Sequence, residues 1–342
     1  MDINFIIFYA LFSIIFLAVC KKYNILIDKK IENHKKYSTK NNSNLLGGIL
    51  IIFFLSYYNL FIEKNYLLYL FLLSVFFIGL MADIRRINSV SQRFFLQLII
   101  VICFVSLINI EINYTKIKFV DELLEINLVN ILFVTFCLLV LINGTNFLDG
   151  INGLVITYYI IIFFIFLFNL NNFIFDKIFL SNILYVLCLM LTLNLLGLIY
   201  LGDSGSYILS LISGIFLINF ASDNNSISPY FVVILLWYPC FELLFSMMRR
   251  SLKESKTYKP DTTHLHQIIY KHLKYNSKIK NNLFLHLITT FIINFYNLVC
   301  FIVTLKYIYN SKILILIISV NIIVYVSIYN YLKFSANRIE RK

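Results

Sequence analysis

Charged residues are scarce in this sequence of 342 residues, making up 13% of it, and proline and glycine occur only 3 and 10 times. Soluble domains carry about twice that share of charge, so the composition excludes a water-soluble globule. The shortage of proline and glycine also argues against collagen-like, proline-rich and glycine-linker chains. Hydrophobic residues make up 60% of the sequence, and we expect them to lie in long helices.

Several familiar sequence patterns are also missing. The six cysteines stand singly in apolar stretches, without the paired spacing of a zinc site or a disulfide framework. The sequence contains no Walker P-loop, no Gly-x-Gly-x-x-Gly turn and no Gly-x-Ser-x-Gly nucleophile elbow. Nucleotide motors, dinucleotide enzymes and nucleophile-elbow hydrolases therefore lose support.

Long apolar runs dominate the sequence instead. About 20 apolar residues span a bilayer as a helix, and a non-helical backbone cannot face lipid, so each run predicts one crossing. We therefore expect an all-α polytopic integral membrane protein, with a single transmembrane domain over residues 1–342 and about 11 transmembrane helices. The crossings are expected at 3–20, 46–62, 66–81, 94–110, 128–145, 154–170, 178–200, 207–222, 229–248, 283–305 and 313–332.

Lysine and arginine are distributed unevenly between the loops. If the first linker is cytoplasmic, strict alternation places 23 of the 29 basic residues on the cytoplasmic side. The positive-inside rule then puts the N-terminus outside and the C-terminus in the cytoplasm. This distribution explains the net charge of +12 without nucleic acid, which we do not expect as a partner. The cytoplasmic loops are predicted at about 21–45, 82–93, 146–153, 201–206 and 249–283.

Three aspartates stand out on the predicted cytoplasmic side, because ionisable residues at membrane-helix ends are costly unless they face a polar cavity. They are Asp83, Asp149 within Asn143–Leu154, and Asp203 within Gly202–Ser206. All three fall on one face of a topology that was derived without them, which favours one shared site. Separated carboxylates at a membrane surface can hold Mg²⁺, whose shell substrate phosphates then complete.

A second polar group lies in the predicted loop 249–283 and contains Arg249, Arg250, Asp261, His264 and His266. Arginine offers paired donors to phosphate, and glycine-rich turns elsewhere on this face expose backbone N–H groups to anions. On a helix, histidines two residues apart would point to different faces. A turn beginning near Asp261 would bring both rings toward one ligand, whereas the alternative is a polar loop with exposed histidines.

Other ionisable residues have less distinctive surroundings. Glu242, inside an expected crossing, is either functional or hydrogen-bonded to a neighbouring helix. We expect His34, His272 and His286 to be incidental.

The polar segments resemble those of the polyprenyl-phosphate N-acetylhexosamine-1-phosphate transferases of glycosyltransferase family 4, which include the phospho-N-acetylmuramoyl-pentapeptide transferase. Asn143–Leu154 resembles the family segment Asn-x-x-Asn-Phe-x-Asp-Gly-x-x-Gly-Leu, and Gly202–Ser206 resembles its Gly-Asp-x-Gly-Ser segment. Pro260–Gln267 resembles the family's histidine motif, and Trp237–Arg250 resembles the stretch that leads into it. We see the resemblance over most of the chain, with order, spacing and sidedness in agreement.

The resemblance implies an enzyme of the bacterial cytoplasmic membrane with its active site on the cytoplasmic face. It would transfer an N-acetylhexosamine 1-phosphate, with N-acetylglucosamine as the first sugar to consider, from a UDP-sugar to undecaprenyl phosphate. The reaction would release UMP and use Mg²⁺, with Mn²⁺ as a substitute. Such a step initiates O-antigen, capsule or cell-wall polysaccharide synthesis. The expected partners are the two substrates and the lipid bilayer, and a homodimer is compatible with the sequence.

The resemblance also assigns roles to individual residues. Asp203, with Asp149, would be a metal ligand, and Asp83 would assist the lipid phosphate. Asp149 would also line the nucleotide-sugar pocket, and the histidines would contact diphosphate or sugar. The substrate-binding candidates are Asn143, Asn146, Gly150, Arg249, Arg250, Asp261, His264 and His266.

Two departures from the family pattern leave alternatives open. Ala82 precedes Asp83 where the family usually has paired acids, and the first loop keeps only Gly47 and Gly48 of a basic, proline-containing segment. The run His264-Leu-His266 is sparser than in the muramoyl-pentapeptide branch, which favours the simple-sugar branch. One alternative is a catalytically impaired binding subunit. Another is a polytopic transporter, which would place its polar groups in broken helices near the membrane midplane.

Overall fold

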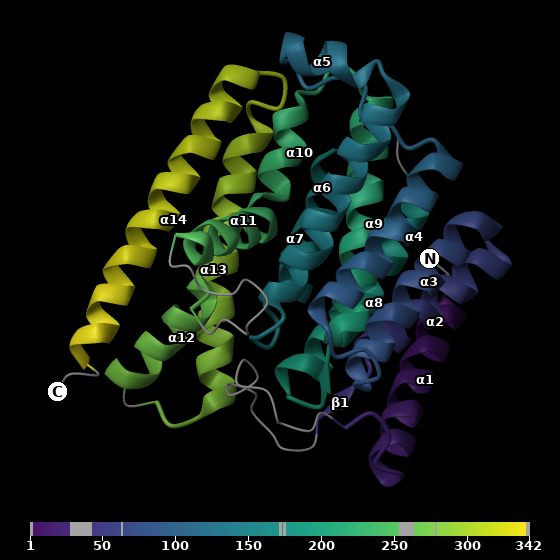
Figure 1. The fold of residues 1–342 in the computed structure, drawn as a ribbon. Coiled ribbons are helices and arrows are strands. Elements are labelled where there is room, and N and C mark those ends of the chain that lie inside the picture. The colour runs from purple at the N-terminus through teal and green to yellow at the C-terminus, as the bar shows by residue number, and fades with distance from the viewer. Residues whose placement is uncertain are drawn as a thin grey trace.

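The computed structural model describes residues 3–27, 43–62, 64–170, 173, 176–252, 263–277 and 279–339. Within these residues the chain is almost wholly helical and forms one bundle (Figure 1). In chain order the elements are α1 (Ile3–Lys22), β1 (Asn44–Leu45), α2 (Gly47–Phe61), α3 (Tyr66–Asp83), α4 (Val90–Ile108), α5 (Lys118–Leu124), α6 (Asn127–Leu148), α7 (Leu154–Asn169), α8 (Lys177–Leu195), β2 (Ile199–Tyr200), α9 (Gly202–Asp223), α10 (Pro229–Leu235), α11 (Trp237–Ser251), α12 (Leu265–Asn276), α13 (Asn282–Leu305) and α14 (Ser311–Ile339).

Among the described residues, eight helices are long and apolar enough to cross a membrane: α1, α3, α4, α6, α8, α9, α13 and α14. The pair α10 and α11 passes the same test as one bent segment, whereas α2 and α7 are apolar but shorter. Many large apolar side chains of these helices are exposed, which suits a lipid-facing surface. A helical polytopic membrane protein is thus confirmed, and the count of eleven crossings and the sides of the termini stay predictions.

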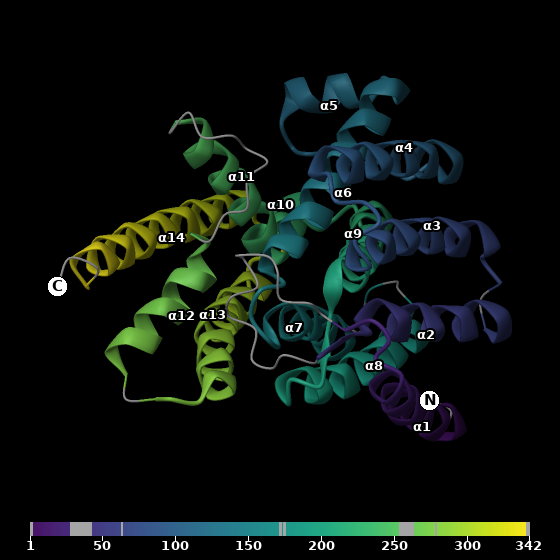
Figure 2. The same cartoon turned by 60° about the horizontal axis from the view of Figure 1, so that its bottom comes forward.

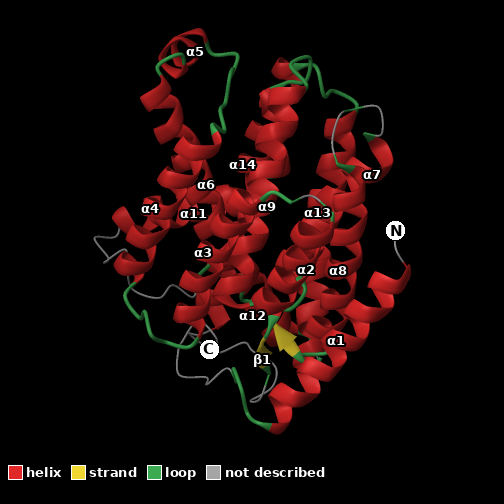
Figure 3. Cartoon of the chain, turned by 90° about the vertical axis from the view of Figure 1, so that its right-hand side faces the viewer, coloured by secondary structure: helices red, strands yellow, loops and turns green. Residues whose placement is uncertain are grey.

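The expectation of a helix over 178–200 is wrong at its C-terminal end. α8 stops at Leu195, and the chain then turns through Gly197, whose φ is 65°. Ile199 and Tyr200 form β2, which pairs in parallel with β1 in a two-stranded sheet. Figure 3 shows this small sheet at one end of the helix bundle. The purely all-α prediction therefore misses one short strand pair.

The expected crossing at 229–248 contains two helices, α10 and α11, in place of one continuous helix. α10 and α11 meet at Leu236 with a bend of 73°. Pro239, in the first turn of α11, has no N–H to continue a helical ladder, so the chain breaks here. A Cβ on Gly144 of α6 would lie 2.7 Å from the Pro239 carbonyl carbon, so α6 packs directly against the bend.

Two further helices lie in segments that were expected to be loops. α5 lies at one end of the bundle, and α12 lies at the opposite end, which is also the end that holds β1 (Figure 1). α12 contacts α13 and α14 and begins directly after His264. The predicted loop 249–283 is thus partly helical, and this helix positions its two histidines.

α9 is the central helix of the bundle. Of its apolar window, 83% is buried, against 17% to 50% for the other long apolar helices of the described residues. It packs most extensively against α3, α6 and α2, and Figure 2 shows it enclosed by neighbouring helices. Its buried residues include the serines Ser204, Ser206, Ser210 and Ser213. The N-terminus of α9 lies beside the ends of α3 and α6.

Candidate active site

The carboxylate of Asp83, at the end of α3, caps the N-terminus of α9. Its Oδ1 accepts a hydrogen bond from the backbone N–H of Asp203 (2.9 Å). Its Oδ2 accepts from the backbone N–H (3.1 Å) and the hydroxyl (2.6 Å) of Ser204. Leu201, the residue before α9, has no side chain that could do this. A carboxylate from another helix thus satisfies free N–H groups at the positive end of the α9 dipole.

Glycines allow α2 and α3 to approach this turn closely. A Cβ on Gly79 would lie 2.6 Å from the Ser204 nitrogen, and a Cβ on Gly48 would lie 2.6 Å from the Ser204 Cβ. Gly202 has a φ of 74°, and a Cβ there would lie 2.8 Å from the Asp83 carboxylate. Residues with side chains do not fit these positions without movement of the backbone.

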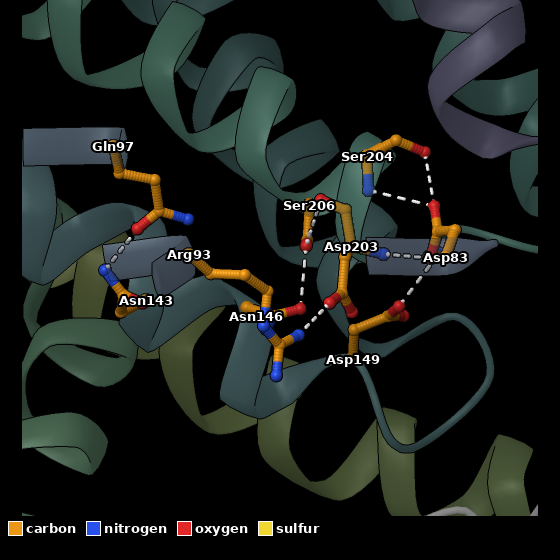
Figure 4. A network of polar contacts seen from close by, with 10 residues as sticks. Asp83, Arg93, Gln97, Asn143, Asn146, Asp149, Asp203, Ser204 and Ser206 are labelled. Carbon is orange, nitrogen blue, oxygen red and sulfur yellow. Dashed lines mark hydrogen bonds and ion pairs between the residues drawn. The ribbon is translucent and has the colours of Figure 1, made fainter. Parts of the chain in front are cut away.

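Asp149, the residue directly after α6, binds the same turn. Its Oδ2 accepts a hydrogen bond from the backbone N–H of Gly202 at 3.0 Å. Asp83 and Asp149 therefore come from different helices and together bind the N–H groups of three consecutive residues (Figure 4). The structure thus brings together all three aspartates that the sequence singled out.

Asp203 directs its carboxylate toward α4, where Oδ2 lies 2.6 Å from Nη1 of Arg93. The side chains of this ion pair are 19% and 22% exposed, so both remain accessible from outside the core. Arg93, which lies in the predicted loop 82–93, is not among the site residues expected from the sequence. A lone arginine at the start of an apolar helix resembles an ordinary solvated charge, and only the fold brings it to Asp203.

The two asparagines of the α6 segment have different surroundings. Asn146 accepts a hydrogen bond from the Ser206 hydroxyl at 3.0 Å, so it belongs to the first turns of α9. Asn143 lies one turn earlier and donates to Oε1 of Gln97 on α4 at 3.0 Å. Asn146 thus lies beside the aspartates, whereas Asn143 lies away from them and beside Gln97 (Figure 4).

The loop after Asp149 is held in place by buried polar side chains. Asn152 donates its backbone N–H to Nδ1 of His286 (2.9 Å), and its carbonyl accepts from the Thr290 hydroxyl (2.8 Å). Asn194, near the end of α8, accepts from the Gly153 backbone N–H and donates to the carbonyl of Ile199 in β2. His286, which we expected to be incidental to the site, is a fully buried ring that supports this loop.

The two histidines of the candidate motif lie together behind this loop. His264 precedes α12 with extended backbone, so its ring stacks on that of His266 at a centroid distance of 5.6 Å. Phe147 of α6 contacts the His264 ring at 5.0 Å, and a Cβ on Gly150 would lie 3.4 Å from Nε2 of His266. The two rings thus lie together, whereas the start of the expected turn near Asp261 lies outside the described residues.

His266 is fully buried, and neither ring nitrogen has a hydrogen-bond partner among the described residues. Burial lowers the pKa of His266 to about 3, because desolvation disfavours the charged ring. The ring is therefore neutral at physiological pH, with one donor and one acceptor nitrogen that a bound ligand could use.

The arginines of the candidate group lie in different places. Arg249 is buried, donates to the Thr263 carbonyl (2.7 Å) and also contacts the Tyr329 hydroxyl, so it supports the start of α12. Arg250 lies over the ring of Phe147, 5.8 Å from its centroid, and so lies close to the histidines. Asp261 lies outside the described residues.

The carboxylates do not form a complete protein cage for a metal ion. Among the described residues, no three His, Cys, Asp or Glu side chains are arranged to hold one. Asp203 nevertheless lies in the first turn of α9, and Asp149 binds that turn from the end of α6. Mg²⁺ is commonly held by one or two carboxylates together with substrate phosphates and water. The carboxylates of Asp149 and Asp203 thus suit an Mg²⁺ ion that is also held by substrate phosphates and water.

A cavity of about 410 Å³ lies near the other end of α9, between α2, α3 and α8. Its lining includes Asp176, Asp223 and Asn59 among many apolar side chains. None of the predicted site residues that the structure describes lines this cavity.

Fold and site define a polytopic membrane protein with a polar site where α3, α6 and α9 meet. Residues 65–221 match the model of glycosyl transferase family 4. This match, which covers a little under half of the chain, supports its membership of the family and indicates a transferase. The match includes all three aspartates and Arg93 but ends before the histidine motif, and it is shorter than the resemblance that the sequence suggested. No curated protein matches the chain.

Proposed function

We propose that the protein transfers an N-acetylhexosamine 1-phosphate, with N-acetylglucosamine as the leading sugar, from a UDP-sugar to undecaprenyl phosphate and releases UMP. The observation that carries the proposal is the convergence of Asp83, Asp149 and Asp203 on the first turn of α9. A helix N-terminus flanked by carboxylates and Arg93 suits a pair of phosphorylated substrates and a divalent cation. This step would initiate the synthesis of O-antigen, capsule or cell-wall polysaccharide.

The proposed topology has eleven crossings, the N-terminus outside and the C-terminus in the cytoplasm of a bacterial cell. It rests on the excess of lysine and arginine in alternate loops. The aspartates, α12 and the histidines would then face the cytoplasm, where UDP-sugars are made. The lipid substrate would reach the site from the surrounding membrane.

Each polar residue has a role in the proposed reaction. Asp203 and Asp149 would hold Mg²⁺, or Mn²⁺ in its place, and this ion would offset charge that develops on the phosphate oxygens. Asp83 is fully engaged with α9, so we assign it the positioning of Asp203 in place of direct contact with the lipid phosphate. Arg93 is close enough to Asp203 to pair with a phosphate oxygen.

The bond changes are those of a direct displacement. An oxygen of undecaprenyl phosphate attacks the β-phosphorus of the UDP-sugar, the bond from that phosphorus to the bridging oxygen breaks, and UMP leaves with that oxygen. The products are UMP and a lipid-linked diphosphate sugar. We favour this route over an aspartyl intermediate, because the acceptor is already an anionic oxygen nucleophile. His264, His266, Gly150 and Arg250 would bind the sugar or diphosphate, and Asn143 and Asn146 would line the nucleotide pocket.

The test uses the purified full chain in lipid nanodiscs with undecaprenyl phosphate, Mg²⁺ and a panel of UDP-N-acetylhexosamines. Release of UMP and the mass of the lipid product report the reaction. Asp203→Asn should abolish release, whereas Asp223→Asn, at the other end of the same helix, should keep it within about twofold. The absence of UMP release with every donor would overturn the assignment.

The alternatives make different predictions in the same preparation. The bend between α10 and α11 is a feature that transporters also use, yet the aspartates lie at helix ends. Flux of an intact substrate without UMP would favour a transporter. Activity that appears only in Ala82→Asp would favour an impaired binding subunit.

A further inference from the structure

A buried carboxylate lies directly behind His264. Glu242, in the middle of α11, is fully buried, and its Oε1 lies 2.9 Å from Nδ1 of His264. The same oxygen accepts a weaker hydrogen bond from the backbone N–H of Leu265 at 3.4 Å. The other oxygen, Oε2, accepts from the Tyr325 hydroxyl of α14 at 2.6 Å. Both oxygens of Glu242 are thus fixed by groups from two other helices.

This arrangement determines which nitrogen of His264 remains for a ligand. An ionised carboxylate only accepts hydrogen bonds, so the proton of the His264–Glu242 bond lies on Nδ1. Nε2 is then the ring atom left for another group. The ring cannot turn freely, because Phe147 and His266 pack against it.

The pair also connects separate parts of the bundle to the site. Glu242 lies on α11, after the bend at Leu236. Tyr325 lies on the C-terminal helix α14, and Phe147 precedes Asp149 by two residues. A carboxylate removed from water is costly unless it is hydrogen-bonded and paired. The presence of a buried glutamate at this position is therefore best explained by its hydrogen bond to His264.

We propose that Glu242 is a positioning residue for His264. It fixes the proton on Nδ1 and directs Nε2 toward the phosphate or sugar oxygens of the nucleotide-sugar donor. Glu242 itself does not touch substrate. The inference rests on the proposed function for its ligand, but the hydrogen bond itself can be tested without any reaction.

Kinetics of a double-mutant cycle test the functional part. Glu242→Gln should lower kcat by about 10-fold to 100-fold with little change in KM, as partners that orient a ligating histidine typically do. In a His264→Asn background the same change should have less than a twofold effect, because the residue through which it acts is gone. Tyr296→Phe, which removes a part-buried hydroxyl hydrogen bond to α14, is the control and should leave kcat unchanged.

A spectroscopic measurement on the wild-type protein tests the pairing independently. Nitrogen-15 NMR of histidine-labelled protein, with His264 identified by its loss in His264→Asn, should show a proton on Nδ1. A proton on Nε2 alone would overturn the proposal, as would an equal loss of kcat from Glu242→Gln in both backgrounds. If the wild type releases no UMP but the Nδ1 proton is present, the proposed function fails while the pairing stands. If UMP is released and the Nδ1 proton is absent, the positioning role fails.

Discussion

Gly79 is the position where adding a single methyl group should disturb the site most without replacing any polar residue. A Cβ there would lie 2.6 Å from the Ser204 nitrogen and 2.9 Å from the Asp203 carbonyl carbon. Both atoms belong to the backbone of α9, so neither can move aside alone. Since heavy atoms of this kind prefer about 3.5 Å or more, Gly79→Ala should push α3 and α9 apart by about 1 Å.

The size of the effect follows from the hydrogen bonds of Asp83, four residues further along α3. Its bonds to the Asp203 and Ser204 nitrogens are 2.9 Å and 3.1 Å long, and a movement of about 1 Å takes both beyond hydrogen-bond range. Overpacking should lower stability by about 1–3 kcal/mol. Displacement of the first turn of α9 by this amount should lower kcat by about 100-fold.

The assay compares UMP release and the thermal melting temperature of Gly79→Ala with those of Gly214→Ala on α9. A Cβ on Gly214 would lie 2.8 Å from Leu138 Cδ2 and 3.0 Å from Leu141 Cδ2, which are flexible side-chain ends. The control should therefore stay within about threefold of wild type, since those ends can rotate away. Equal effects of the two alanines, or a wild-type rate in Gly79→Ala, would refute the reasoning.

Three further changes have defined outcomes. Arg93→Gln removes the cation paired with Asp203, so Mn²⁺ binding measured by EPR should tighten up to about fivefold, since partly exposed ion pairs contribute about 0.2–1 kcal/mol. His286→Ala leaves the buried N–H of Asn152 without an acceptor, so the free energy of unfolding in SDS should fall by about 1–3 kcal/mol. His266 has a folded pKa of about 3 against 6.5 for a free histidine, so below about pH 6.5 the unfolded state takes up the proton. The wild type should lose about 1.4 kcal/mol more per pH unit than His266→Gln in that range.

Each of these three predictions would be contradicted by a specific result. Unchanged or weaker Mn²⁺ binding in Arg93→Gln would show that Asp203 does not bind the ion. Unaltered stability in His286→Ala would mean that the loop does not need this acceptor. A parallel loss of stability in wild type and His266→Gln between pH 7.5 and 5 would show that His266 is protonated in the folded protein.

The sequence predicted the helical spans and the grouping of the aspartates well. Apolar runs of about 20 residues have no other stable form in lipid, so their positions follow from composition alone. The grouping of Asp83, Asp149 and Asp203 followed from loop alternation, which needs only the side of each loop. The structure brings all three together at the first turn of α9, which contains Asp203 and to which Asp83 and Asp149 hydrogen-bond.

What could not be predicted depends on contacts between distant residues. The two-residue strands β1 and β2 are too short to show a periodic pattern. The roles of Arg93 and His286 depend on partners far away in the sequence, Asp203 and Asn152. The bend at Leu236 had a local signal in Pro239, but a lone proline near a helix start predicts a continuous helix equally well.

The burial of α9 also bears on how the chain is made. Its serine-containing, almost wholly enclosed surface has little lipid-facing area, so it gains stability mainly from its protein neighbours. Those neighbours, α2, α3 and α6, all precede α9 in the chain and leave the ribosome first. When α9 is synthesised, a partner surface already exists in the membrane, and the active-site turn can form as soon as the helix docks.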